Sequence, residues 1–148
     1  MKTSGTPVKI TLDIHINRDG HHEDFEFIVF GHYYKRNATS YYIYDEVWEN
    51  GKTHTIVKYI DGKVPEIQIL RTGTLNMRLF FKENEVMKGS YKTNIGTFKV
   101  ETSTKDLEYD WDEQMKQGKM NINYHFFIEQ IEVGTYQLQF TFKEEKGL

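Results

Sequence analysis

The chain has 148 residues, no cysteine and a net charge of −3 at neutral pH. This length suits one domain with its own core, and we expect a single domain over residues 1–148. The lack of cysteine excludes disulfides and thiolate metal ligands. The lack of a basic excess argues against a protein built to hold nucleic acid.

The residue composition favours strands over helices. One alanine and seven leucines stand against 14 threonines, 13 isoleucines, eight valines and 22 aromatic residues. Alanine and leucine are the residues that helices prefer, whereas β-branched and aromatic side chains pack better on a pleated sheet. The composition therefore argues against a helical bundle and predicts an all-β fold.

Apolar and polar residues alternate with a period of two along most of the chain, and turn residues interrupt this alternation at short intervals. Asn50-Gly51 and Asp61-Gly62 are among the clearest turn signals, because these residue types tolerate the positive φ of tight hairpin turns. The predicted strands span residues 8–16, 23–35, 40–49, 52–60, 64–71, 75–82, 86–93, 97–103, 120–128 and 135–143.

Residues 104–119 fit two patterns. Leu107, Tyr109 and Trp111 alternate with acidic residues, which favours a strand. Residues 112–117 would also suit one helical turn. We predict a strand here.

A meander of nine or ten strands would leave two exposed edges if it stayed an open sheet, and closure removes such edges. We therefore predict an antiparallel meander β-barrel of eight to ten strands, of lipocalin type. A barrel of this size either fills with its own side chains or holds one small ligand.

Several short motifs occur in the order and spacing of a known family. They are Tyr44-Asp-Glu46, Lys58, Arg71-Thr-Gly73, Tyr91-Lys-Thr93-Asn-Ile-Gly96, Thr102 and Tyr124. On these motifs the sequence resembles the YwiB family of small uncharacterised bacterial proteins over nearly the whole chain. The resemblance implies a lipocalin-like (calycin-like) barrel and no particular reaction. The family's turn often reads Tyr-x-Thr-Pro-Tyr-Gly, whereas this chain has Asn94 and Ile95 in place of the Pro-Tyr pair.

Arg71 is the first candidate for a functional residue. It shares strand parity with Ile69, so an inward Ile69 implies an inward Arg71. A buried arginine requires a partner, because its desolvation is otherwise very costly. One candidate is Glu46, which shares parity with Tyr44. The other is an acidic ligand gripped by the guanidinium fork. We favour the structural pair and keep the ligand as the alternative.

Four further residues join the candidate set. Lys58 is in phase with Ile56, which allows an inward direction, although its long stem more often reaches a rim. Tyr91, Thr93 and Tyr124 either line an interior polar network or satisfy one another. The candidate ligand-binding residues are Arg71, Glu46, Lys58, Tyr91, Thr93 and Tyr124.

Other kinds of site lack support in the sequence. We find no Gly-rich phosphate loop, nucleophile elbow or catalytic triad pattern, and we expect neither an enzyme nor a cofactor. The six histidines show no metal-ligand spacing, so we expect no metal site. Residues 32–44 place aromatics beside Lys35 and Arg36, as in single-strand nucleic-acid binders, but such tyrosine pairs more often pack across a hairpin.

The sequence supports two functional hypotheses. In the leading one, a small barrel binds an apolar or amphipathic molecule inside, with Arg71 and Glu46 at its polar end. In the alternative, aromatic residues fill the barrel, and its outer surface contacts protein or RNA. The chain has no run of 18 apolar residues, so we expect no membrane span. Residues 1–16 alternate and lack the apolar block of a signal peptide, so we expect a cytoplasmic protein.

Overall fold

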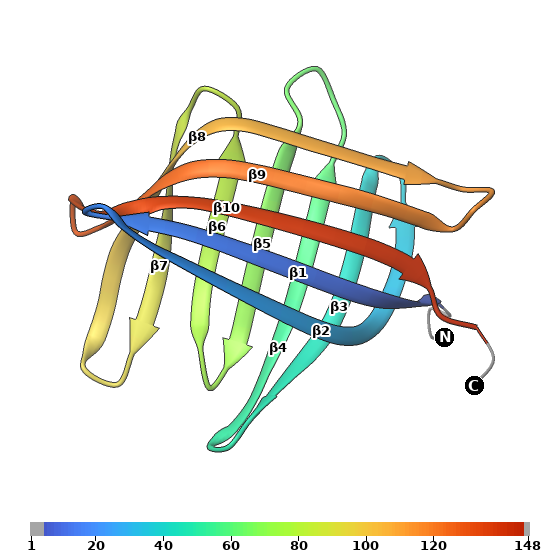
Figure 1. The fold of residues 1–148 in the computed structure, drawn as a ribbon, viewed down its shortest axis with the longest axis horizontal. Coiled ribbons are helices and arrows are strands. Elements are labelled where there is room, and N and C mark those ends of the chain that lie inside the picture. The colour runs from blue at the N-terminus through green and yellow to red at the C-terminus, as the bar shows by residue number, and fades with distance from the viewer. Residues whose placement is uncertain (1–4, 147–148) are drawn as a thin grey trace.

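The alternating sequence forms ten antiparallel strands, which a computed structural model describes over residues 5–146 (Figure 1). The predicted domain of residues 1–148 also includes residues 1–4 and 147–148, which lie outside the described range. The strands are β1 (Thr6–Arg18), β2 (His21–Arg36), β3 (Thr39–Trp48), β4 (Gly51–Ile60), β5 (Glu66–Gly73), β6 (Asn76–Lys82), β7 (Val86–Thr93), β8 (Gly96–Asp112), β9 (Gln117–Ile128) and β10 (Ile131–Glu144).

Each strand pairs with its neighbours in sequence, and β1 pairs with β10 to close the barrel. The prediction of an all-β antiparallel meander barrel is thereby confirmed. Figure 1 shows the barrel flattened into two layers that cross steeply, with β9, β10, β1 and most of β2 in one layer and β3 to β7 in the other. Across the described residues, no helix has the length and apolar character needed to cross a membrane.

The turn between β1 and β2 sets the pairing of the longest hairpin. Asp19 and Gly20 both have positive φ, at 48° and 80°. Two such residues form the two-residue turn whose twist matches that of the flanking strands. This turn fixes the register, which places His15 opposite Asp24 and Ile14 opposite Phe25.

The prediction of a strand over residues 104–119 is wrong in part. Strand β8 continues to Asp112 and carries a register shift between Thr104 and Asp106. A bulge bends a strand, and Figure 1 shows β8 curving from one layer into the other. Residues 113–116 form the turn, in which the Lys116 N–H donates to the Asp112 carbonyl oxygen at 2.7 Å. The strand alternation ends where this local hydrogen bond replaces the ladder.

Aromatic side chains fill one half of the interior. The Tyr42 ring stacks on Phe142 with centroids 3.7 Å apart, and Tyr33 stacks on Trp111 at 4.1 Å. The Tyr42 hydroxyl lies 2.8 Å from the Tyr109 hydroxyl, so a buried polar atom has a partner. This cluster of Tyr33, Tyr42, Tyr109, Trp111 and Phe142 is called the aromatic half below.

Strands β2 and β3 pair along only part of their length. Residues 31–36 of β2 pair with residues 39–44 of β3, and the ladder ends at Gly31 and Tyr44. A Cβ on Gly31 would lie 2.2 Å from the Ile43 carbonyl oxygen, so this close approach requires glycine. Before Gly31, β2 stays paired with β1 but separates from β3. The barrel is closed, but its wall has no backbone ladder between the first part of β2 and the end of β3.

Candidate functional site

The other half of the interior holds a cavity of about 330 Å³. Its wall is mostly aliphatic and aromatic, and the side chains come from both layers. The lining residues are Leu12, Ile14, Ile16, Phe25, Phe27, Tyr44, Glu46, Ile69, Arg71, Met77, Leu79, Tyr124, Phe126, Tyr136, Leu138 and Phe140. The volume lies at the low end of the range of about 300–1,000 Å³ that small-molecule sites occupy.

The cavity opens where β2 separates from β3. Phe25 and Phe27 face inward, because they lie opposite Ile14 and Leu12 in the β1 ladder. They are nevertheless 46% and 38% exposed, since no strand covers them on the β3 side. The Phe27 ring meets Trp48 of β3 edge-on, with centroids 6.4 Å apart. The mouth is thus bounded by aromatic side chains instead of a backbone ladder.

An ion pair lies on the cavity wall at this mouth. The Arg71 guanidinium of β5 donates through Nη2 to the Glu46 carboxylate of β3. Strand β4 lies between β3 and β5 and presents Thr53 and Thr55 inward. Because these side chains are small, Arg71 and Glu46 can reach each other across β4. The Arg71 Nε is buried and has no hydrogen-bond partner among residues 5–146. The Nε–H group of the guanidinium is therefore available to an acceptor on a ligand.

Two tyrosines add hydroxyl groups to the same wall. Burial raises the pKa of Tyr44 and of Tyr124, and nearby Arg71 opposes both shifts. Both hydroxyls therefore stay protonated at neutral pH and can donate or accept a hydrogen bond. The Tyr124 ring is held edge-on by Phe81 at 4.8 Å and stacked on Tyr136 at 5.5 Å. The Tyr124 hydroxyl is thus carried by a ring packed between two other aromatic rings.

The structure separates the six candidate residues into two sets. Arg71, Glu46 and Tyr124 line the cavity. Lys58 lies outside the barrel, with its Nζ 5.6 Å from the centroid of the Tyr41 ring. The inward direction that the sequence allowed for Lys58 does not occur, because the inner face of β4 carries Thr53, Thr55 and Val57. The larger Ile56 and Ile60 lie on the outer face.

Thr93 and Tyr91 also lie away from the cavity wall. The Thr93 hydroxyl accepts from the Ile95 N–H and donates to the Gly96 carbonyl oxygen, so it stabilises the turn between β7 and β8. Tyr91 packs beside Phe98 at 6.4 Å. The prediction that Tyr91 and Thr93 bind a ligand is therefore corrected: both side chains have structural partners, and neither lines the cavity.

Sequence reasoning missed most of the cavity wall. The inward residues of β1 follow from the alternation, and the Asp19-Gly20 turn then identifies Phe25 and Phe27 as inward too. No local signal shows that β3 leaves these phenylalanines uncovered. The wall depends on which strands meet across the barrel.

The aromatic segment 32–44 makes contacts within the hairpin. Tyr34 and Tyr41 lie opposite each other, and their rings stack at 4.7 Å on the outer surface beside Lys58. This is the cross-strand packing that the sequence favoured over a nucleic-acid platform.

Possible metal ligands meet only on the outer face of the barrel, within the range that the structure describes. His15, His22 and Asp24 place one ligand atom each within 4.8 Å of one another. Sequence reasoning missed this group because its three residues are divided between the two strands of a hairpin. The two-residue turn could have revealed it, since the turn fixes His15 opposite Asp24.

Comparisons with known proteins agree with this architecture. Residues 9–140 match DUF1934, described as a domain of unknown function. The chain is 32% identical over 123 residues to the "Uncharacterized beta-barrel protein YwiB" of Bacillus subtilis (strain 168), and the match covers 83% of each chain. The fold is similar to the crystal structure of that organism's YwiB protein, with a TM-score of 0.83 and 28% identity over 95% of this chain and 93% of the other. The resemblance seen in the sequence motifs is confirmed.

Proposed function

We propose that this chain, which belongs to the DUF1934 family of domains of unknown function, is a non-catalytic binding protein. It holds one small apolar or amphipathic molecule in the barrel interior. The observation that carries the proposal is the apolar cavity of about 330 Å³ with a polar group set at one end. Burial of an apolar tail there would contribute roughly 25 cal/mol per Å² of apolar area. This is a lipocalin-like mode of binding.

The polar end supplies the contacts for a ligand's head. The Arg71 Nε has a free donor, and the Tyr44 and Tyr124 hydroxyls lie on the same wall. A head with an accepting oxygen, such as an alcohol, amide or carboxylate, matches these groups. Arg71 and Glu46 neutralise each other, so the site accepts a neutral head without leaving a buried net charge.

The same pairing argues for a non-catalytic role. Glu46 is the carboxylate of the cavity wall, and its ion pair with Arg71 occupies it. A general base needs a free carboxylate or imidazole within reach of the substrate.

We place this binding protein in the cytoplasm, which cell fractionation would test.

A displacement assay tests the proposal. Untagged protein is titrated with the apolar fluorophore N-phenyl-1-naphthylamine and then with octanol and octanoate. We expect saturable probe binding that both compounds reverse. Ile69→Phe fills the cavity and should weaken probe binding by at least about tenfold, which is about 1.4 kcal/mol. Leu70→Phe is the matched control, because its side chain lies on the opposite face of β5.

Native mass spectrometry of the freshly purified protein provides a second measurement. We expect a bound small molecule in part of the population, and less of it in Ile69→Phe. A clean apo mass together with no displaceable probe would reject ligand binding. It would favour the alternative in which the outer surface contacts a protein or RNA.

A further inference from the structure

Two histidines and an aspartate converge on the outer face of the β1–β2 hairpin. His15 Nδ1 lies 2.5 Å from Asp24 Oδ1, and His22 Nε2 lies 2.8 Å from the same oxygen. All three ligand atoms lie within 4.8 Å of one another. We propose that His15, His22 and Asp24 bind one divalent transition-metal ion, with Zn²⁺ as the best-suited member of that class.

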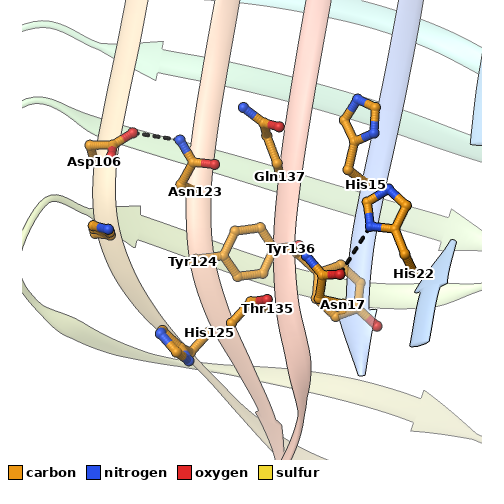
Figure 2. Close-up of a pocket in the computed structure, with 11 residues that line it drawn as sticks. His15, Asn17, His22, Asp106, Asn123, Tyr124, His125, Thr135, Tyr136 and Gln137 are labelled. Atoms are coloured by element: carbon orange, nitrogen blue, oxygen red, sulfur yellow. Dashed lines mark hydrogen bonds between the residues drawn. The ribbon is translucent and has the colours of Figure 1, made fainter. Parts of the chain in front are cut away.

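Two amide side chains orient the imidazoles toward the aspartate. His15 Nε2 lies 3.1 Å from the Gln139 carbonyl oxygen, and His22 Nδ1 lies 2.9 Å from the Asn17 carbonyl oxygen. Figure 2 shows the second of these contacts as a dashed line. Because an amide oxygen only accepts, each histidine donates its N–H there. Metal-bound histidines usually have their second nitrogen held in this way.

The hydrogen bonds to Gln139 and Asn17 determine which nitrogen of each imidazole faces Asp24. In neutral imidazoles the remaining nitrogens, His15 Nδ1 and His22 Nε2, carry lone pairs that point at the carboxylate oxygen. Two lone pairs against an anionic oxygen repel one another unless a proton or a metal cation lies between them. One metal ion between the two nitrogens and the carboxylate oxygen resolves this conflict with a single cation.

The geometry needs only a small adjustment. Tetrahedral Zn²⁺ with ligands at about 2.0–2.1 Å places ligand atoms about 3.3 Å apart. The side chains of His15, His22 and Asp24 are 34%, 52% and 56% exposed, so the two contacts to Asp24 can lengthen by the roughly 0.5–0.8 Å required. Two imidazole nitrogens and one carboxylate oxygen suit zinc and its neighbours better than calcium or magnesium.

The surroundings favour a cation and leave a coordination position open. Asp13 lies two residues before His15 on the same face, and Glu26 lies opposite Asp13. The site borders an outer groove of about 570 Å³, whose wall includes Asn123, His125 and Tyr136 (Figure 2). Three protein ligands leave a fourth position for water or for a molecule in that groove.

Other surface histidines provide the controls. His54 lies 2.8 Å from Asp45, and His125 lies 2.8 Å from Glu132. Each of these pairs has one histidine, whereas the proposed site has two imidazoles on one carboxylate. His54→Ala therefore removes a histidine–carboxylate pair of the same kind and leaves the proposed site unchanged.

Isothermal titration with ZnCl₂ tests the proposal on untagged protein that has been cleared of metal with EDTA. At pH 7.5 we expect one bound ion per chain, and His15→Ala or His22→Ala should weaken binding by more than about tenfold. Gln139→Ala should weaken it by about tenfold, as expected for a residue that positions a ligand. His54→Ala should bind like the native chain, and binding should weaken at pH 5.5 because protons compete with the metal ion for its ligand atoms.

Cobalt supplies an independent readout. Co²⁺ in place of zinc should give visible d–d absorption that disappears in His22→Ala. Circular dichroism of each variant establishes that the barrel is intact, which we expect for substitutions at exposed positions. The proposal is overturned if the native chain binds no metal at pH 7.5, or if His15→Ala and His22→Ala bind Zn²⁺ as tightly as His54→Ala.

Discussion

The two halves of the barrel interior share strands β2, β3 and β10 but are filled differently. In the aromatic half, Tyr42 and Phe142 stack at 3.7 Å, and Tyr33 and Trp111 stack at 4.1 Å. In the other half, the side chains line a cavity of about 330 Å³. Both halves show the same alternation of apolar and polar residues, so the alternation does not explain the difference.

The difference follows from the ladder between β2 and β3. Where residues 31–36 pair with residues 39–44, the layers are held together and large rings interlock. Beyond Gly31 the two strands separate, and Phe25 and Phe27 have no covering strand on one side. A local loss of backbone pairing thus decides which half is filled and which can receive a ligand.

The largest expected effect is in the aromatic half. Tyr42→Ala removes a fully buried ring, its stack on Phe142 and its contact with the Tyr109 hydroxyl. We expect a loss of about 3–5 kcal/mol in the free energy of unfolding, measured by urea denaturation. Tyr34→Ala removes a stacked ring on the outer surface and should cost about 1 kcal/mol. Equal losses would contradict the view that this half carries the stability.

A matched pair on β5 compares a filled part of the interior with the cavity. Ile67 is fully buried and is absent from the cavity wall, whereas Ile69 lines the cavity. Ile67→Phe should lower the free energy of unfolding by about 1–3 kcal/mol because it overpacks a filled region. Ile69→Phe should cost less than about 1 kcal/mol, since the added ring has room. The reverse order in urea denaturation would show that the cavity is not available space.

The ion pair at the mouth tests whether the open half is organised for binding. Arg71→Met leaves Glu46 without its partner, and solvent at the mouth limits the cost. We expect about 1–2 kcal/mol of lost stability by urea denaturation, together with roughly tenfold weaker octanol displacement. Lys58→Met on the outer surface should change neither quantity appreciably. Lost stability with unchanged displacement would assign the pair to the fold alone.

The smallest expected effect lies outside both halves. In metal-free buffer the hydrogen bond to Asp24 raises the pKa of His15 above 6.5, and Gln139 and Asp13 add to this shift. The resulting stabilisation is present below pH 6.5 and is lost as the pH rises through the raised pKa. The urea midpoint should therefore fall slightly more between about pH 6 and 8 in the native chain than in His15→Gln. Parallel curves would contradict the raised pKa.

The sequence predicted part of the site because some of its determinants are local. The parity that places Arg71 inward with Ile69 spans only a few residues of one strand, and the same holds for Glu46 with Tyr44. Parity with Ile56 did not place Lys58 inward, because threonines fill the inner face of β4 and larger isoleucines lie outside. Side-chain size alone therefore does not tell the two faces of a strand apart.

The amino-acid sequence by itself determined most of the strands and short turns, because these depend on residues that are close along the chain. The tertiary structure decided where the long strand β8 bends, how β1 meets β10, and where β2 leaves β3. These outcomes depend on pairing and packing between residues far apart in sequence. The cavity, its mouth beside Phe25 and Phe27, and the contact of Arg71 with Glu46 all follow from such distant contacts.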